Sequence, residues 1–161
     1  MMIDNRELAP IEQAMEILNR RAGSYNVVTI SRIEGFLNEE ILRQVLDLIQ
    51  CRHPRLNSRI VGDLDNLRFE TEGTQKIPLR VENKLHNEEW QEVVLEEMNE
   101  KIDSSKVLLR SVLVPTFAGK MILNFMFSEP SLGRDTMESL VNNAILCLVE
   151  TCNNKVVTLM T

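Results

Sequence analysis

The residues of this chain that could do chemistry lie in a turn between a buried strand and an amphipathic helix. An apolar run over residues 121–127 predicts the strand, residues 128–133 form a sharp turn, and residues 134–149 have helical spacing. Such junctions often carry catalytic side chains. The turn supplies the hydroxyls of Ser128 and Ser131 and the carboxylate of Glu129, but no histidine, cysteine or glycine-rich loop. We therefore expect a fold suited to catalysis without its usual reactive groups.

Length and composition narrow the class of protein. The 161 residues, 43% of them hydrophobic, are enough for one core, so we expect a single domain over residues 1–161. A net charge of -6 and a pI near 5.0 argue against a nucleic-acid binder, which needs a concentrated basic surface. The densest basic stretch, residues 52–59, is either a solvated helix end or an anion site. No apolar run approaches the length of about 20 residues that spans a bilayer.

The cysteines and the N-terminus indicate the compartment. Cys51, Cys147 and Cys152 are an odd number without the spacing of a metal site, and Cys147 is expected on an apolar helical face. The first residues lack the charged and apolar segments of a signal peptide. We expect a cytoplasmic protein with reduced thiols.

The elements that must position the turn follow from apolar spacing and turn residues. Helices are predicted over residues 10–21, 39–52, 88–102 and 134–149, and strands over residues 25–33, 56–61, 67–71, 77–81, 107–114, 120–127 and 155–160. Residues 107–114 and 120–127 are apolar enough for the centre of a sheet.

Individual residues mark the ends and faces of these helices. Ile11, Met15 and Leu18 recur at helical spacing along the first helix, Asn38 is suited to cap the second, and Pro54 ends it. The third helix carries a run of glutamates that we expect to form a solvated face, namely Glu88, Glu89, Glu92, Glu96 and Glu97.

One pattern runs from the end of the first predicted strand through the second predicted helix. It comprises residues 34–38, the helix stripe Ile41, Leu42, Val45, Leu48 and Ile49, and Arg52-His53-Pro54-Arg55-Leu56, together with residues 8–13 and 104–110. These segments resemble the opening of the condensation-type acyltransferases. The family includes the condensation domains of nonribosomal peptide synthetases, polyketide-ester and wax-ester acyltransferases and, more distantly, chloramphenicol acetyltransferase. The resemblance covers most of the chain and implies a single N-terminal lobe of the chloramphenicol acetyltransferase-like fold. That lobe is an α/β structure, a two-layer α+β sandwich with helices packed on a mixed sheet.

The resemblance also assigns positions in the turn. In the family, two histidines, three variable residues, an aspartate and a glycine follow the strand, and the second histidine is the general base. Here the histidine positions hold Phe127 and Ser128, the aspartate position holds Leu132, and only Gly133 matches the motif. A serine hydroxyl accepts no proton near neutral pH without a base of its own. The resemblance therefore implies a degenerate active site, with His53 in a structural position at a helix end.

The ion-pair partner of Arg110 tests whether the active-site motif is degenerate. In the family, the arginine on the corresponding strand resembles an ion-pair partner of the motif aspartate. In this chain Leu132 stands at the position of that aspartate. Arg110 then points to solvent or takes a new carboxylate, Glu129 or Asp135, of which we favour Asp135 because it lies in the first turn of the next helix. Glu129 as a catalytic acid or base is the alternative role for that residue.

The resemblance implies function and partners as well. The family's enzymes join two lobes around a channel, so we expect a homo-oligomer or a separate second-lobe chain, and a carrier protein is a further possible partner. Coenzyme A or phosphopantetheine thioesters would be substrates, with no permanently bound cofactor and no metal. The functional alternatives are a split acyltransferase lobe that is inactive alone, a noncatalytic binding or scaffold module, and an unrelated α/β domain.

Overall fold

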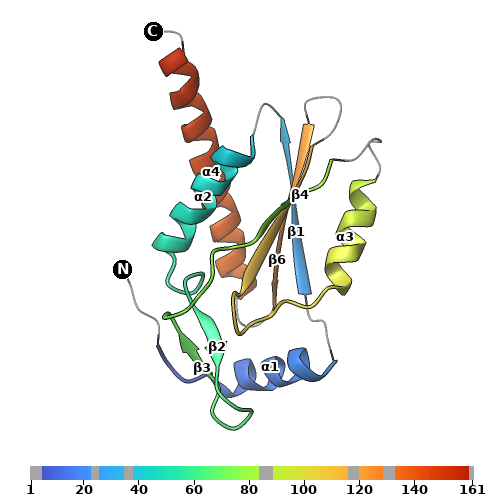
Figure 1. Cartoon of the computed structure of the whole chain (residues 1–161), viewed down its shortest axis with the longest axis vertical. Helices are drawn as coiled ribbons and strands as arrows, with labels where there is room; N and C mark the ends of the chain where they lie inside the picture. The colour runs from blue at the N-terminus through green and yellow to red at the C-terminus, as the bar shows by residue number, and fades with distance from the viewer. Residues whose placement is uncertain are drawn as a thin grey trace.

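The computed structural model describes residues 5–22, 26–34, 38–83, 89–115, 120–128 and 133–159, and for residues 34, 120, 128 and 152–159 the description is of the backbone only. The elements in chain order, drawn in Figure 1, are α1 (Pro10–Ala22), β1 (Asn26–Glu34), α2 (Glu39–Arg52), β2 (Arg59–Val61), β3 (Arg68–Glu70), β4 (Leu79–Val81), α3 (Trp90–Asn99), β5 (Leu109–Pro115), β6 (Lys120–Ser128) and α4 (Arg134–Leu159).

Four of the strands form one mixed sheet, in the order β1-β6-β5-β4. β6 pairs antiparallel with both β1 and β5, whereas β4 runs parallel to β5. The central strands are the two whose apolar character predicted that position, because a strand covered on both faces has no need of polar alternation. This prediction is confirmed.

Helices cover both faces of the sheet. On one face, α2 and α4 pack against alternate residues of the central strands, among them Leu113, Leu123 and Phe125. On the other face, Val93 of α3 packs with Val112 and Met126. Successive strand residues point to opposite faces, which separates the two apolar clusters. The expected α/β lobe with a mixed sheet is confirmed.

The second helix begins and ends where the sequence predicts. The side chain of Asn38 accepts a hydrogen bond from the backbone N–H of Ile41 at 2.8 Å, and the N–H of His53 donates to the carbonyl of Ile49 at 3.0 Å. Pro54 then prevents further helix. His53 is thus a helix-ending residue, as the resemblance implied.

The predicted hairpin is present as β2 and β3, which pair in an antiparallel ribbon, and β3 also forms a single antiparallel bridge with Glu7. Phe69 of β3 is fully buried, and the turn before it contains Gly62 at φ 99°. A β-carbon at Gly62 would stand 2.4 Å from the carbonyl oxygen of Asn66, so the turn requires glycine there.

Two expectations about the helices are wrong. Residues 155–159 continue α4 rather than forming a last strand, because no proline or glycine interrupts residues 134–159 and helical hydrogen bonding carries on. Glu97 of α3 is 2% exposed rather than part of a solvated acidic face. The cause of its burial lies in the candidate site, described next.

Candidate functional site

The turn that would carry chemistry leaves the sheet at the end of β6. There Ser128 pairs with Asn26 at the start of β1, and Phe127 pairs with Leu109 at the start of β5. The C-terminal end of α3 lies at this same end of the sheet, since the Asn26 side-chain amide donates to the carbonyl of Glu100 at 2.6 Å. The candidate site is therefore bounded by β1, β5, β6 and α3.

Phe127, at the first histidine position, faces the core beneath α2 and α4 and is 1% exposed. The side chain of Ser128, and the whole of Glu129 and Leu132, lie outside the described residues.

Gly133 occupies the glycine position of the family's motif, but its described surroundings do not exclude a side chain. It lies just before α4, and its carbonyl accepts the N–H of Met137 at 3.0 Å. Its φ is not positive, and among the described residues a β-carbon there would meet only the Thr136 hydroxyl, at 3.9 Å. Nothing in the described part of the chain requires a glycine at this position.

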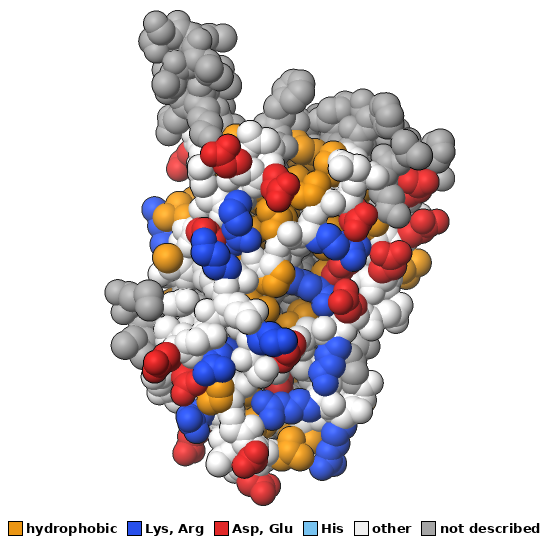
Figure 2. Space-filling model, in the orientation of Figure 1, with side chains coloured by type: hydrophobic (Ala, Val, Ile, Leu, Met, Phe, Trp, Pro, Cys, Tyr) orange, Lys and Arg blue, Asp and Glu red, His pale blue; other side chains and the backbone are white. Residues whose placement is uncertain are grey.

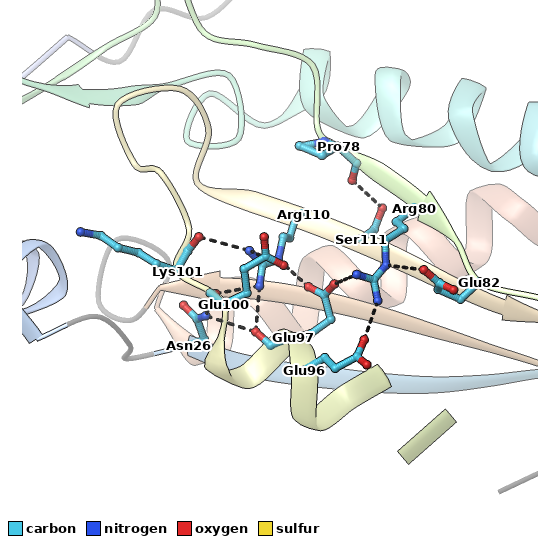
Figure 3. A network of polar contacts seen from close by, with 10 residues as sticks. All are labelled: Asn26, Pro78, Arg80, Glu82, Glu96, Glu97, Glu100, Lys101, Arg110 and Ser111. Carbon is cyan, nitrogen blue, oxygen red and sulfur yellow. Dashed lines mark hydrogen bonds and ion pairs between the residues drawn. The ribbon is translucent and has the colours of Figure 1, made fainter. Parts of the chain in front are cut away.

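Arg110 does not pair with Asp135, which is a correction to the expectation from the sequence. Its Nε lies 2.6 Å from Oε2 of Glu97, and its Nη2 donates to the carbonyls of Glu97 at 2.8 Å and Glu100 at 2.7 Å (Figure 3). Arg110 sits at an even-numbered position of β5, on the α3 face, while α4 and the exposed Asp135 lie on the other side of the sheet. The guanidinium closes the end of α3, where carbonyls lack helical partners.

Glu97 is held from two sides. Besides Arg110, the Nη1 of Arg80 on β4 lies 3.3 Å from its Oε1, and the same guanidinium reaches Glu82 at 3.1 Å and Glu96 at 3.3 Å (Figure 3). A buried carboxylate needs such compensation, because removal from water costs several kcal/mol. These contacts explain why Glu97 turns inward although Glu92 and Glu96 of the same helix are exposed.

The histidines give the turn no base within the described structure. His53 ends α2, and burial together with the nearby charge of Arg52 lowers its pKa below the usual range for histidine. His86 lies outside the described residues. No group of three or more potential metal ligands is found among the described residues, and no described helix has the length and hydropathy to cross a bilayer.

A shallow pocket lies beside this end of the sheet. It has a volume of about 480 Å³ and is lined by Arg20, Lys101, Asp103, Ser104 and Ser105. Its polar groups are already engaged: the Lys101 ammonium donates to the Arg20 carbonyl at 3.1 Å, and the Ser105 hydroxyl donates to Asp103 at 2.5 Å. Figure 2 shows acidic and basic side chains interspersed over the face that it displays.

Sequence reasoning missed two polar residues on the α3 face. Glu97 was assigned to a solvated face, and Asn124 was passed over within the apolar run of β6, where it is fully buried. Both atoms of the Asn124 amide lack a hydrogen-bond partner in the described part of the chain. The signal was a lone amide inside an otherwise apolar strand, since such groups are rarely buried without a role.

No family model and no curated protein matches the chain. Solved structures do: a mutant of the starter condensation domain of the rhizomide synthetase RzmA has a TM-score of 0.79 at 10% identity, over 92% of this chain and 38% of that one. SgcC5 from Streptomyces globisporus has a TM-score of 0.71 at 18% identity, over 90% and 37%. A complex of the X-domain and OxyB from teicoplanin biosynthesis matches with a TM-score of 0.75 at 14% identity, over 92% and 33%.

The chain spans less than two fifths of the length of the proteins that it matches. The likeness extends over the sheet and its helices, and at these identities it concerns the fold and not the activity. Over about nine tenths of its length, this chain has the fold of one lobe of a condensation domain.

Proposed function

We propose that this chain is a condensation-type lobe that does not transfer acyl groups by itself. The observation that carries the proposal is the commitment of Arg110 to Glu97, at the place where the family's arginine would hold the motif aspartate. With Leu132 in place of that aspartate and Ser128 in place of the base, neither the base nor its supporting pair is available.

The missing step is proton removal from the acceptor. In acyl transfer, an amine or alcohol attacks the thioester carbonyl of coenzyme A or phosphopantetheine, the acceptor loses a proton to the base, and the thiol leaves with a proton. General-base catalysis contributes about 10²- to 10⁴-fold to such a step. A lobe that positions the reactants but has no general base would lack this rate enhancement.

The second candidate function is a noncatalytic protein-binding or scaffold module. It is favoured by one of the similar solved structures, which is itself a complex of two proteins, the X-domain and OxyB. Partners of this chain would then be a carrier protein, a second-lobe chain or another copy of itself.

Acyl transfer measured on the full chain tests the first proposal. With acetyl-coenzyme A as donor and a simple amine as acceptor, we expect only the uncatalysed rate. The variant Ser128→His with Leu132→Asp should stay at that rate, because Glu97 retains Arg110. Adding Glu97→Gln to this variant tests whether release of Arg110 matters. An enzyme-like rate of the unmodified chain alone would contradict the proposal.

Binding and complementation distinguish the two candidates. A split enzyme should gain acyl transfer when a separately produced second lobe of a condensation domain is added, and the gain should rise with Ser128→His and Leu132→Asp. A binding module should stay at the uncatalysed rate in the same mixture. Its affinity for a phosphopantetheine-loaded carrier protein, measured by calorimetry, should be unchanged by those substitutions.

A further inference from the structure

The first helix exposes most of its apolar side chains and buries polar ones, while Ile17 is half-buried and packs against the core. A helix on the surface of a globular protein normally buries its apolar stripe and exposes its polar face. In α1 the buried residues are Glu16, 1% exposed, and Asn19, fully buried, whereas Ile11 is 65% and Leu18 40% exposed.

Polar contacts fix this orientation. Glu16 accepts the hydroxyl hydrogen of Ser104 and forms an ion pair with Arg20 at 2.8 Å, while the Asn19 amide donates to its other oxygen at 3.4 Å. One turn earlier, the Gln13 amide donates to the carbonyl of Leu64 at 2.9 Å. The contacts of Glu16 with Ser104 and of Gln13 with Leu64 join α1 to other segments, so rotating α1 to bury the apolar stripe would break them, whereas the contacts of Glu16 with Asn19 and Arg20 lie within the helix.

The outward stripe is continuous and has a small residue at its middle. The exposed apolar residues of α1 are Pro10, Ile11, Ala14, Leu18 and Ala22. α1 lies across one end of the molecule, at its lower edge in Figure 1. A contiguous exposed apolar stripe of this kind marks a site of association.

We propose that the α1 stripe is the contact between two copies of this chain, with the helices packed antiparallel about a two-fold axis near Ala14. The small side chain of Ala14 lets the two backbones approach closely at the crossing. Ile11 of one copy then packs near Leu18 of the other, since these residues lie on either side of Ala14.

The charges at the two ends of the stripe favour a second copy of the chain as the partner and an antiparallel orientation of the two helices. Arg21 is exposed at the C-terminal end of α1, and Glu7 is exposed in the segment before Pro10, where its backbone forms a bridge with Arg68. Neither side chain forms an ion pair within the described part of the chain. An antiparallel pair brings Glu7 of each copy towards Arg21 of the other. The two N-terminal ends, and the two basic C-terminal ends, are kept apart.

One helix pair buries less area than a standard stable interface, so the dimer is weak and concentration-dependent. Sedimentation equilibrium of the full chain over a wide concentration range should show a monomer–dimer transition. Leu18→Arg, with Ile11→Arg as a second variant, should raise the dissociation constant about tenfold or more, which corresponds to loss of a central apolar contact. The matched control is Leu95→Arg on α3, a leucine that is 60% exposed and should leave the constant unchanged. Circular dichroism checks that each variant is folded.

Charge-reversal variants test whether the partner is a second copy of the chain and whether the two α1 helices run antiparallel. Glu7→Arg and Arg21→Glu should each weaken the dimer about two- to fivefold, as expected for exposed ion pairs repeated by symmetry. The double variant should recover wild-type affinity, because the reversed charges meet again. A monomer at every concentration, a dimer insensitive to Leu18→Arg, or a double variant no better than the single ones would overturn the proposal. The inference does not depend on whether the turn after β6 catalyses a reaction.

Discussion

Arg110 on β5 places its Nε 2.6 Å from Oε2 of Glu97 on α3, and the same guanidinium donates to the carbonyls of Glu97, Glu100 and Lys101. One side chain thus neutralises a buried carboxylate and completes the end of a helix. The fork of donors in arginine suits this task, whereas the point charge of lysine does not. Arg110 fastens α3 to the sheet in this lobe, without an aspartate in the turn.

Removing Arg110 should therefore destabilise the fold strongly. Arg110→Ala leaves Glu97 buried with only Arg80 as partner, and we expect the free energy of unfolding to fall by about 3 kcal/mol. The matched control is Lys76→Ala, which breaks an ion pair with Asp47 of the same 2.6 Å length, but at a lysine that is 75% exposed. That control should change the free energy by about 1 kcal/mol or less. Denaturant unfolding measures both, and equal losses would contradict the assigned role of burial.

Asn124 should be replaceable by an apolar residue. Its amide is fully buried on the α3 face and has no partner within the described chain, so its desolvation is uncompensated. Asn124→Leu keeps the number and branching of the heavy atoms, although its methyl groups are bulkier than the amide, and removes that cost. We expect stability to be unchanged or to rise by about 1 kcal/mol. Leu123→Ala, the neighbouring fully buried position, should lose about 2–5 kcal/mol by comparison.

A loss of stability in Asn124→Leu would mean that the amide has a partner, such as an internal water molecule. The comparison is valid if the unfolding free energies of both variants fall with the same slope against denaturant concentration.

The sequence predicted the elements better than their orientations. The caps at Asn38 and His53 and the central position of β5 and β6 depend on local residues, so local patterns were sufficient. The inward turn of Glu97 depends on Arg80 and Arg110, two residues on other strands whose position is known only once the sheet has formed. No periodicity within α3 contains that information.

The first helix illustrates the same limit more sharply. The recurrence of Ile11, Met15 and Leu18 predicted a helix correctly, but hydrophobic spacing alone favours burial of that stripe. The loop that carries Ser104 instead supplies a partner for Glu16 and turns the polar face inward. In the candidate site, likewise, the resemblance pointed to Asp135 or Glu129 as the partner of Arg110, whereas the carboxylate that Arg110 contacts is Glu97 on α3.

Gly62 and Gly133 should respond in opposite ways to substitution. Gly62 has φ 99° and no room for a side chain, so Gly62→Ala should lower the free energy of unfolding by about 1–3 kcal/mol. Gly133→Ser meets only the Thr136 hydroxyl and places a good capping residue before α4, so its effect should stay within about 0.5 kcal/mol or be stabilising. Thermal unfolding of both variants distinguishes them, and a damaging Gly133→Ser would show that the motif glycine is still required.

His53 should make stability depend on pH below neutrality. Burial and the charge of Arg52 lower its pKa in the folded state, while the unfolded chain keeps a value near 6.5. The unfolded state therefore binds more protons in this range, and the stability contributed by neutral His53 is fully present above about pH 6.5 and is lost as the pH falls through the folded-state pKa. Proton NMR of the imidazole should give a titration midpoint below 6.5 that rises in Arg52→Gln. The difference in unfolding free energy between wild type and His53→Asn should shrink on acidification, and a difference independent of pH would contradict the assigned cause.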